Sequence, residues 1–130
     1  MEKIFALYAS SNKGKTTTLN ILIDLLAVVS DKYNIWREYE GWAWFIIKNK
    51  TISVCTSGDN ANTVKNNIKD YKDCDIFISA SRTKGGSVNE IEKLAKSENL
   101  KIEWIEKEDN PKKNKEIAAD LFRRIMNEIF

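Results

Sequence analysis

Residue types that handle phosphate and magnesium stand together near the start of the chain. Residues 9–16 form the run A-S-S-N-K-G-K-T, which ends in glycine, lysine and a hydroxyl residue. This pattern is typical of a loop whose backbone N–H groups curl around a polyphosphate at a helix N-terminus. In such a loop Lys15 would reach the outer phosphates and the Thr16 hydroxyl would ligate Mg²⁺. The expected phosphate-binding residues are Ser10, Ser11, Asn12, Lys13, Gly14, Lys15, Thr16 and Thr17.

The segments that flank this loop predict the strand and the helix that it requires. Residues 4–8 are apolar throughout, as in a central strand covered on both faces. Residues 19–29 are apolar around most of a helical circumference, so that helix should pack on more than one side. A chance G-K-T at a helix start is the alternative, and these flanks make it the weaker one. Ala9 replaces the usual first glycine, so the loop must turn there through ordinary backbone angles or be distorted.

The segment resembles the P-loop NTPase superfamily. Its run from Gly14 to Thr18, G-K-T-T-T, is most similar to that of signal-recognition GTPases and of the ATPases that partition chromosomes and plasmids. The partition ATPases carry an extra lysine just after the first loop glycine, and this chain has Ser10 there. Their mechanism, in which that lysine reaches across a dimer, is therefore not expected. The resemblance implies binding of a nucleoside triphosphate with Mg²⁺.

An acidic residue should complete the metal site, and Asp59 is the first candidate. It follows the third sheet strand, as the metal-binding acid does in the resembling family, although Ser57 and Gly58 intervene. Together with Thr16 it forms the expected metal pair. The alternative is that Asp59 caps the helix that follows. Asp75 stands at the start of a strand, at the wrong end of the sheet, and is expected to be structural.

Three further residues could act on a transferring phosphoryl group. Glu38 and Glu40 follow the first helix in an aromatic stretch, where either could orient water or bind a substrate. The alternative for both is a solvated strand face. Arg82 directly follows a buried strand, where a guanidinium could stabilise phosphoryl charge; a plain surface arginine is equally compatible. The expected catalytic set is Lys15, Asp59, Glu38 and Arg82.

Composition restricts the function classes. The 130 residues suit one domain, 1–130, and 42% hydrophobic with 31% charged residues argues against both disorder and a membrane-embedded chain. A net charge of +2 gives no strong nucleic-acid signal. The chain has no histidine and only Cys55 and Cys74, which excludes a zinc site or a histidine-activated nucleophile. Both thiols should be buried, and we expect a cytoplasmic protein with no signal peptide.

The periodicity predicts an α/β fold, a three-layer α/β/α sandwich. Its sheet should be mostly parallel with one antiparallel hairpin, and the whole should be P-loop NTPase-like. Asn49-Lys50 should form the hairpin turn, Ser87 with Glu90 a capping box, and Asn110 a cap before Pro111. The last strand should lie at an edge. The predicted strands are 3–8, 33–40, 42–47, 51–55, 74–80 and 100–105, and the predicted helices are 16–30, 61–71, 87–97 and 111–128.

Three functions fit this pattern. The first is Mg²⁺-dependent binding of ATP or another NTP, with slow hydrolysis or switching; ATP is expected because the loop 81–86 has no guanine-reading N-K-x-D motif. The second is a small nucleotide or nucleoside phosphotransferase. The third is a degenerate, non-catalytic interaction module. A homodimer or a protein partner is possible in each case, and the aromatic group Trp36, Trp42, Trp44, Tyr39 and Phe45 is either cross-strand packing or a stacking surface.

Overall fold

A six-stranded sheet, in the order β2-β3-β4-β5-β1-β6, forms the centre of the computed structural model, which describes residues 1–130. β1 pairs in parallel with β5 and β6, and β4 pairs in parallel with β5. β3 pairs antiparallel with both β2 and β4. The sheet is therefore mostly parallel, as expected, but it has two antiparallel pairings where one hairpin was predicted. The strands are β1 (Lys3–Tyr8), β2 (Lys32–Arg37), β3 (Gly41–Ile47), β4 (Lys50–Cys55), β5 (Ile76–Ser81) and β6 (Ile102–Glu106).

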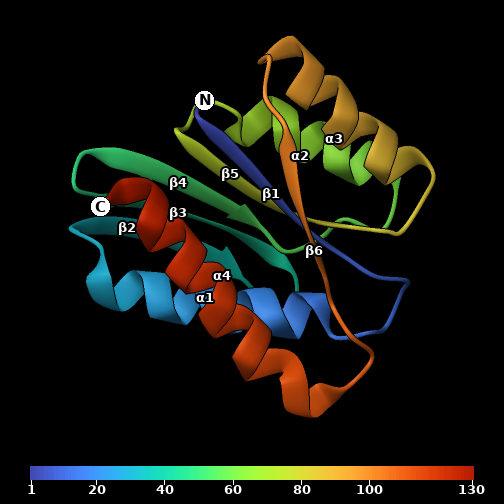
Figure 1. The fold of residues 1–130 in the computed structure, drawn as a ribbon, viewed down its shortest axis with the longest axis horizontal. Coiled ribbons are helices and arrows are strands. Elements are labelled where there is room, and N and C mark those ends of the chain that lie inside the picture. The colour runs from blue at the N-terminus through green and yellow to red at the C-terminus, as the bar shows by residue number, and fades with distance from the viewer.

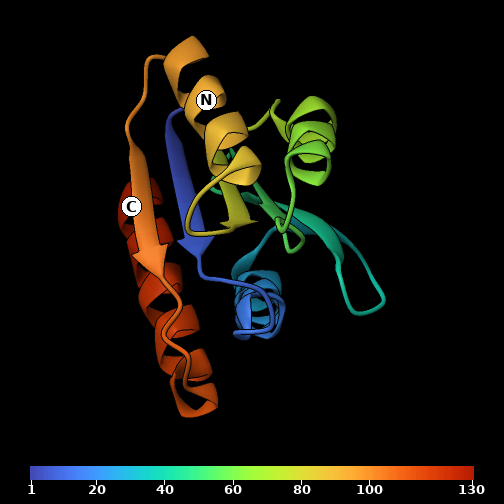
Figure 2. The ribbon, with the colours of Figure 1, turned by 90° about the vertical axis from the view of Figure 1, so that its right-hand side faces the viewer.

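Helices cover both faces of the sheet and give the predicted three layers (Figures 1 and 2). α1 (Lys15–Val29) and α4 (Asn114–Ile129) pack together on one face. α2 (Ala61–Tyr71) and α3 (Gly86–Ser97) pack together on the other. A short 3₁₀ helix, Pro111–Lys113, leads into α4, and the Asn110 side chain caps it by accepting from the Lys112 N–H, as predicted.

The alternation of side chains along β1 explains why this strand is apolar throughout. Phe5 and Leu7 belong to the core beneath α1 and α4, whereas Ile4 and Ala6 belong to the core beneath α2 and α3. All four are fully buried. A strand with helices on both faces cannot expose either set of side chains, so β1 holds a fixed central position. Its carboxyl end therefore presents the following loop at a defined place on the sheet edge.

Several local predictions need correction. The β3–β4 turn is formed by Lys48 and Asn49, which have φ of 49° and 65°, rather than by Asn49 and Lys50. Positive φ at both central residues is what this class of two-residue turn requires, and asparagine tolerates it better than most residues. α1 packs on more than one side, as predicted, because it contacts both the sheet and α4. The prediction fails only in the last turn of α1, where Val28 is 85% exposed.

The aromatic residues of β2 and β3 divide between packed and exposed positions. Trp42 lies against Tyr71 of α2, with ring centroids 5.2 Å apart and an interplanar angle of 31°, and Phe45 is fully buried. Trp36, directly across from Trp42, is 54% exposed. Packing within the protein thus explains Trp42 and Phe45, whereas Trp36 is exposed on the edge strand β2.

The predicted edge position of the last strand and the burial of both thiols are confirmed, but β5 and β6 each begin two residues later than predicted, so Cys74 precedes β5. β6 forms the edge of the sheet beside β1. Cys55 and Cys74 are free and buried. Burial raises the pKa of the Cys74 thiol to about 11 and raises the pKa of Cys55 still further, so neither has the character of a reactive thiolate.

Candidate functional site

The loop 9–14, between β1 and α1, curls through two left-handed residues. Asn12 has φ of 60° and Gly14, at the N-cap of α1, has φ of 88°. A Cβ on Gly14 would lie 3.1 Å from the Asn114 Oδ1 atom, so this position favours glycine for both its conformation and its space. Ala9 has no left-handed φ, and its N–H donates to the Ser81 carbonyl at 3.2 Å. The loop therefore accommodates alanine in place of the first glycine through an ordinary backbone conformation.

The Lys15 side chain turns inward and is only 6% exposed. Its ammonium donates to the carbonyl of Ala9 at 2.8 Å, to Asp59 Oδ1 at 2.9 Å and to the carbonyl of Ser81 at 3.0 Å. These contacts use all three donors of the ammonium group. The positive charge consequently lies between the ends of β1 and β5, facing the carboxylate of Asp59.

Asp59 contributes the acidic side of the site. Its carboxylate is 44% exposed, and Arg82 Nε lies 4.0 Å from the same oxygen that contacts Lys15. The alternative role for Asp59 as the cap of α2 is wrong, because Asn60 occupies that position and accepts from the Thr63 N–H at 2.8 Å. The loops that follow β1, β4 and β5 thus bring Lys15, Asp59 and Arg82 together.

Gly58 makes this approach possible. A Cβ on Gly58 would lie 2.0 Å from the carbonyl oxygen of Ala80, a distance that no side chain allows. The chain after β4 can therefore lie directly against the end of β5, which places the next residue, Asp59, at Lys15. Gly58, which in the sequence interrupts the approach from the strand to the acid, therefore positions that acid in the structure.

Thr16 also lines the hollow, beside Lys15 in the chain. Its hydroxyl donates to the Thr56 carbonyl at 3.2 Å, and Thr16 is 8% exposed. The Thr56 hydroxyl in turn accepts from the Gly41 N–H at 2.7 Å, which joins the start of β3 to the site. No sequence pattern marked Thr56, because its contacts depend on the pairing of β3 with β4.

The hollow itself is small. Its volume is about 40 Å³. All three donors of the Lys15 ammonium already have acceptors, so Lys15 can bind a phosphate only by giving up at least one of them. The lining residues are Asn12, Lys13, Gly14, Lys15, Thr16, Tyr39, Glu40, Thr56, Gly58 and Asp59. Ser10, Ser11 and Thr17 do not line it.

Of the two glutamates considered from sequence, the structure brings Glu40 into the hollow and leaves Glu38 outside it. β2 ends at Arg37, earlier than predicted, so Glu38 lies on an exposed bend. The Asn20 side chain holds the bend by donating to the Tyr39 carbonyl at 3.1 Å. Glu40 thereby replaces Glu38 as the glutamate that could face a bound phosphate.

The chain after β6 supports the loop from behind. Lys107 is 2% exposed and its side chain lies beside Gly14. Burial lowers the pKa of Lys107, and its ammonium donates to the carbonyls of Glu108 and Asn110. Lys13 pairs with Asp109 at 2.8 Å on the surface. This segment therefore holds the loop at two points, at Gly14 and at Lys13.

The loop that carries Arg82 differs from the prediction at one point. The predicted capping box of Ser87 with Glu90 is wrong, because α3 begins at Gly86 with Gly85 as its N-cap and no side-chain cap. The Ser87 hydroxyl instead accepts from the Arg82 N–H at 3.0 Å. Since Ser87 is 2% exposed, this contact fixes the backbone of Arg82 at the end of β5.

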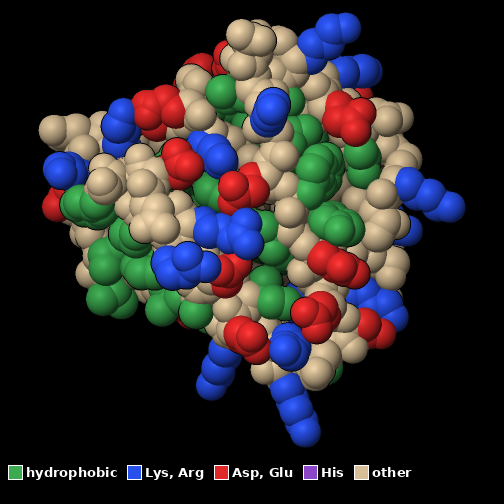
Figure 3. Space-filling view, in the orientation of Figure 1, with side chains coloured by type: hydrophobic (Ala, Val, Ile, Leu, Met, Phe, Trp, Pro, Cys, Tyr) green, Lys and Arg blue, Asp and Glu red, His purple; other side chains and the backbone are tan.

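Charged side chains of both signs are interspersed over the face seen in Figure 3, with no large area of a single sign. No helix of the chain is both long enough and apolar enough to cross a bilayer.

In comparisons with known proteins, no family model, no curated protein and no solved structure matches this chain.

Proposed function

We propose that this protein binds a nucleoside triphosphate, ATP by preference, together with Mg²⁺, and that it hydrolyses the nucleotide slowly or uses it as a switch. The observation that carries the proposal is the meeting of a buried ammonium, Lys15, with a half-exposed carboxylate, Asp59, at 2.9 Å. They meet at the carboxyl edge of a mostly parallel sheet, where such folds bind ligands. The proposal includes the fold: we infer that it is of the P-loop NTPase type.

The donor set fits magnesium. Mg²⁺ prefers oxygen ligands and commonly takes one or two from the protein, with phosphate and water supplying the rest. The Thr16 hydroxyl and the Asp59 carboxylate both line the hollow, and no cluster of three His, Cys, Asp or Glu side chains competes with them. When bound, the metal would neutralise phosphate charge.

The chain's own residues would change partners as the nucleotide enters. Phosphate oxygens would replace the Ala9 and Ser81 carbonyls as acceptors from Lys15, and the free N–H groups of residues 12–16 would donate to the phosphates. Asp59, released from Lys15, would turn to the metal with Thr16. Arg82, 4.0 Å from Asp59, is placed to approach the outermost phosphate.

A non-catalytic binding module is the second candidate, and the partners of Lys15 favour it. Lys15 is fully partnered within the chain, so a phosphate must displace at least one of its acceptors. Such a protein would bind nucleotide weakly and release no phosphate. The two candidates therefore differ in turnover, not in the residues that bind.

Thermal unfolding in the presence of ATP and Mg²⁺ tests the proposal. A ligand at 100 times its Kd stabilises the folded state by about 2.7 kcal/mol, which for a chain of this size raises Tm by about 10 °C. Phosphate release under the same conditions identifies the hydrolase, and its absence alongside a Tm increase identifies the binding module. No change in Tm at millimolar ATP with Mg²⁺ would refute both.

A further inference from the structure

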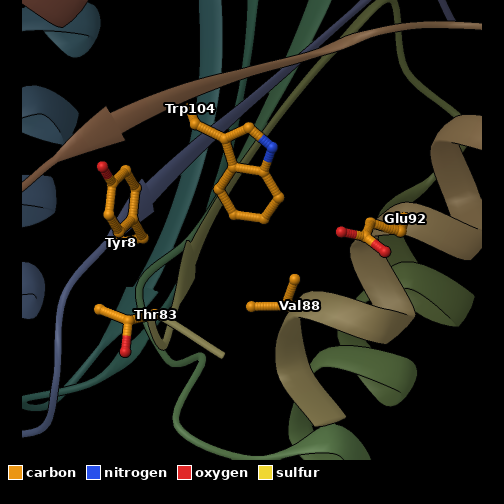
Figure 4. A pocket seen from close by; sticks show the side chains of 5 residues that line it. All are labelled: Tyr8, Thr83, Val88, Glu92 and Trp104. Atoms are coloured by element: carbon orange, nitrogen blue, oxygen red, sulfur yellow. The ribbon is translucent and has the colours of Figure 1, made fainter. Parts of the chain in front are cut away.

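A larger pocket, of about 420 Å³, lies beside the loop on the face of the sheet covered by α2 and α3. Its lining comes from the end of β1, the loop after β5, α3 and β6: Tyr8, Thr83, Val88, Glu92 and Trp104 (Figure 4). This volume falls in the range of about 300–1,000 Å³ that small-molecule sites occupy. Nothing in the phosphate-binding site uses these side chains.

The walls of the pocket are aromatic and apolar. The Tyr8 and Trp104 rings meet edge to face, with centroids 5.9 Å apart and an interplanar angle of 81°. Val88 points from α3 toward the indole (Figure 4). A flat heteroaromatic ring can stack or pack against such walls, a contact that suits any nucleobase because every base has a π-face.

One acidic group faces this aromatic wall. The Glu92 carboxylate points from α3 toward Trp104 (Figure 4), and no lysine or arginine lines the pocket. A carboxylate only accepts hydrogen bonds, so its complement is a group that carries N–H donors. An exocyclic amino group on an aromatic ring satisfies both features at once.

The pocket borders the phosphate site on a definite side. Tyr8 immediately precedes Ala9, and Thr83 immediately follows Arg82. The carbonyls of Ala9 and Ser81 are the two that hold the Lys15 ammonium. If a nucleotide binds as proposed, with Lys15 at its outer phosphates, the pocket borders the terminal-phosphate end of the site.

We propose that this pocket binds a second molecule, a nucleoside whose base carries an exocyclic amino group, next to the triphosphate. The inference rests on the proposed function for its choice of a nucleoside. The base packs against Trp104 and Val88, and its amino group donates to Glu92. A nucleoside held here supports the phosphotransferase alternative over a simple switch, because it places a hydroxyl-bearing molecule beside the terminal phosphate.

The indole N–H signals of the four tryptophans provide the test. Adenosine, which lacks phosphate, is titrated while these signals are followed by NMR, with the Trp104 signal assigned from its absence in Trp104→Phe. We expect the Trp104 signal to shift, and Trp104→Ala to weaken adenosine binding at least about tenfold, or about 1.4 kcal/mol. The matched control is Trp36→Phe, which alters an exposed tryptophan on β2 and leaves adenosine binding unchanged. The three other indole signals report whether Trp104→Ala remains folded.

Further measurements separate this inference from the proposed function. Lys15→Ala should lose ATP binding and keep adenosine binding, whereas Trp104→Ala should keep its affinity for ATP with Mg²⁺. Purine riboside, which is adenosine without its exocyclic amino group and has no N–H on the base, should bind at least about tenfold more weakly than adenosine. The inference is overturned if millimolar adenosine leaves the Trp104 signal in place, if purine riboside binds equally well, or if Trp104→Ala loses ATP and adenosine together. Adenosine binding without ATP binding would refute the triphosphate site and leave the base pocket standing.

Discussion

Replacing Lys15 with alanine is expected to weaken ATP binding at least about 100-fold, or about 2.7 kcal/mol. The ammonium is the one buried cation that can reach the phosphates, and charge-assisted hydrogen bonds in a shielded site are the strong ones. Calorimetric titration with ATP and Mg²⁺ measures the loss. Lys15→Met should show the same loss, because methionine keeps the apolar stem and removes only the ammonium.

Lys50 provides the matched control for this prediction. It stands at the start of β4, outside the hollow, and it is paired with Glu2 at the surface, where an ion pair contributes little. Lys50→Ala should therefore change ATP affinity by no more than a few-fold. Equal losses for Lys50→Ala and Lys15→Ala would show that general charge, not the inward ammonium, attracts the nucleotide.

Replacing Asp59 with asparagine should uncouple nucleotide binding from magnesium. In the protein without nucleotide, Asp59 competes for Lys15, and with nucleotide it would become a metal ligand. The amide is a poorer ligand and a weaker partner for the ammonium. We expect the Mg²⁺-dependent gain in ATP affinity and any phosphate release to fall about 10- to 100-fold, whereas ATP binding in EDTA stays equal or improves.

Asp24→Asn is the control for this second prediction. Asp24 forms a comparable surface pair, with Arg37 at 2.6 Å, but it lies on α1 outside the hollow. Its replacement should leave the response to Mg²⁺ unchanged. If Asp59→Asn retains a normal response to Mg²⁺, Asp59 is only a partner of Lys15 and the metal site must be sought elsewhere.

The fold could be predicted from the sequence largely because its central strands, β1 and β5, are short and apolar. β1 and β5 are buried along nearly their whole length, and such runs leave little choice of element. The errors lie where polar side chains choose among partners. The Ser87 hydroxyl accepts from the Arg82 N–H and does not cap α3. β2 ends at Arg37, whose guanidinium donates to the Asn20 carbonyl and to Asp24.

The site could be predicted in part for a different reason. Lys15 and Asp59 are 44 positions apart, yet parallel strand ends share one edge of the sheet, so their meeting follows from topology. The sequence could not show that Glu40, and not Glu38, lines the hollow, because this depends on how the chain bends after β2. The pocket at Trp104 could not be foreseen either, since it needs the spacing between α3 and β6, which only packing determines.

The most direct measurement is a crystal structure of the protein soaked with ATP and Mg²⁺. The account predicts phosphate density within the loop 9–16, with Lys15 Nζ moved from the Ala9 and Ser81 carbonyls to the phosphates and a metal between the Thr16 hydroxyl and Asp59. A loop without phosphate density, with the ammonium still donating to both carbonyls and to Asp59 at millimolar ATP, would contradict it.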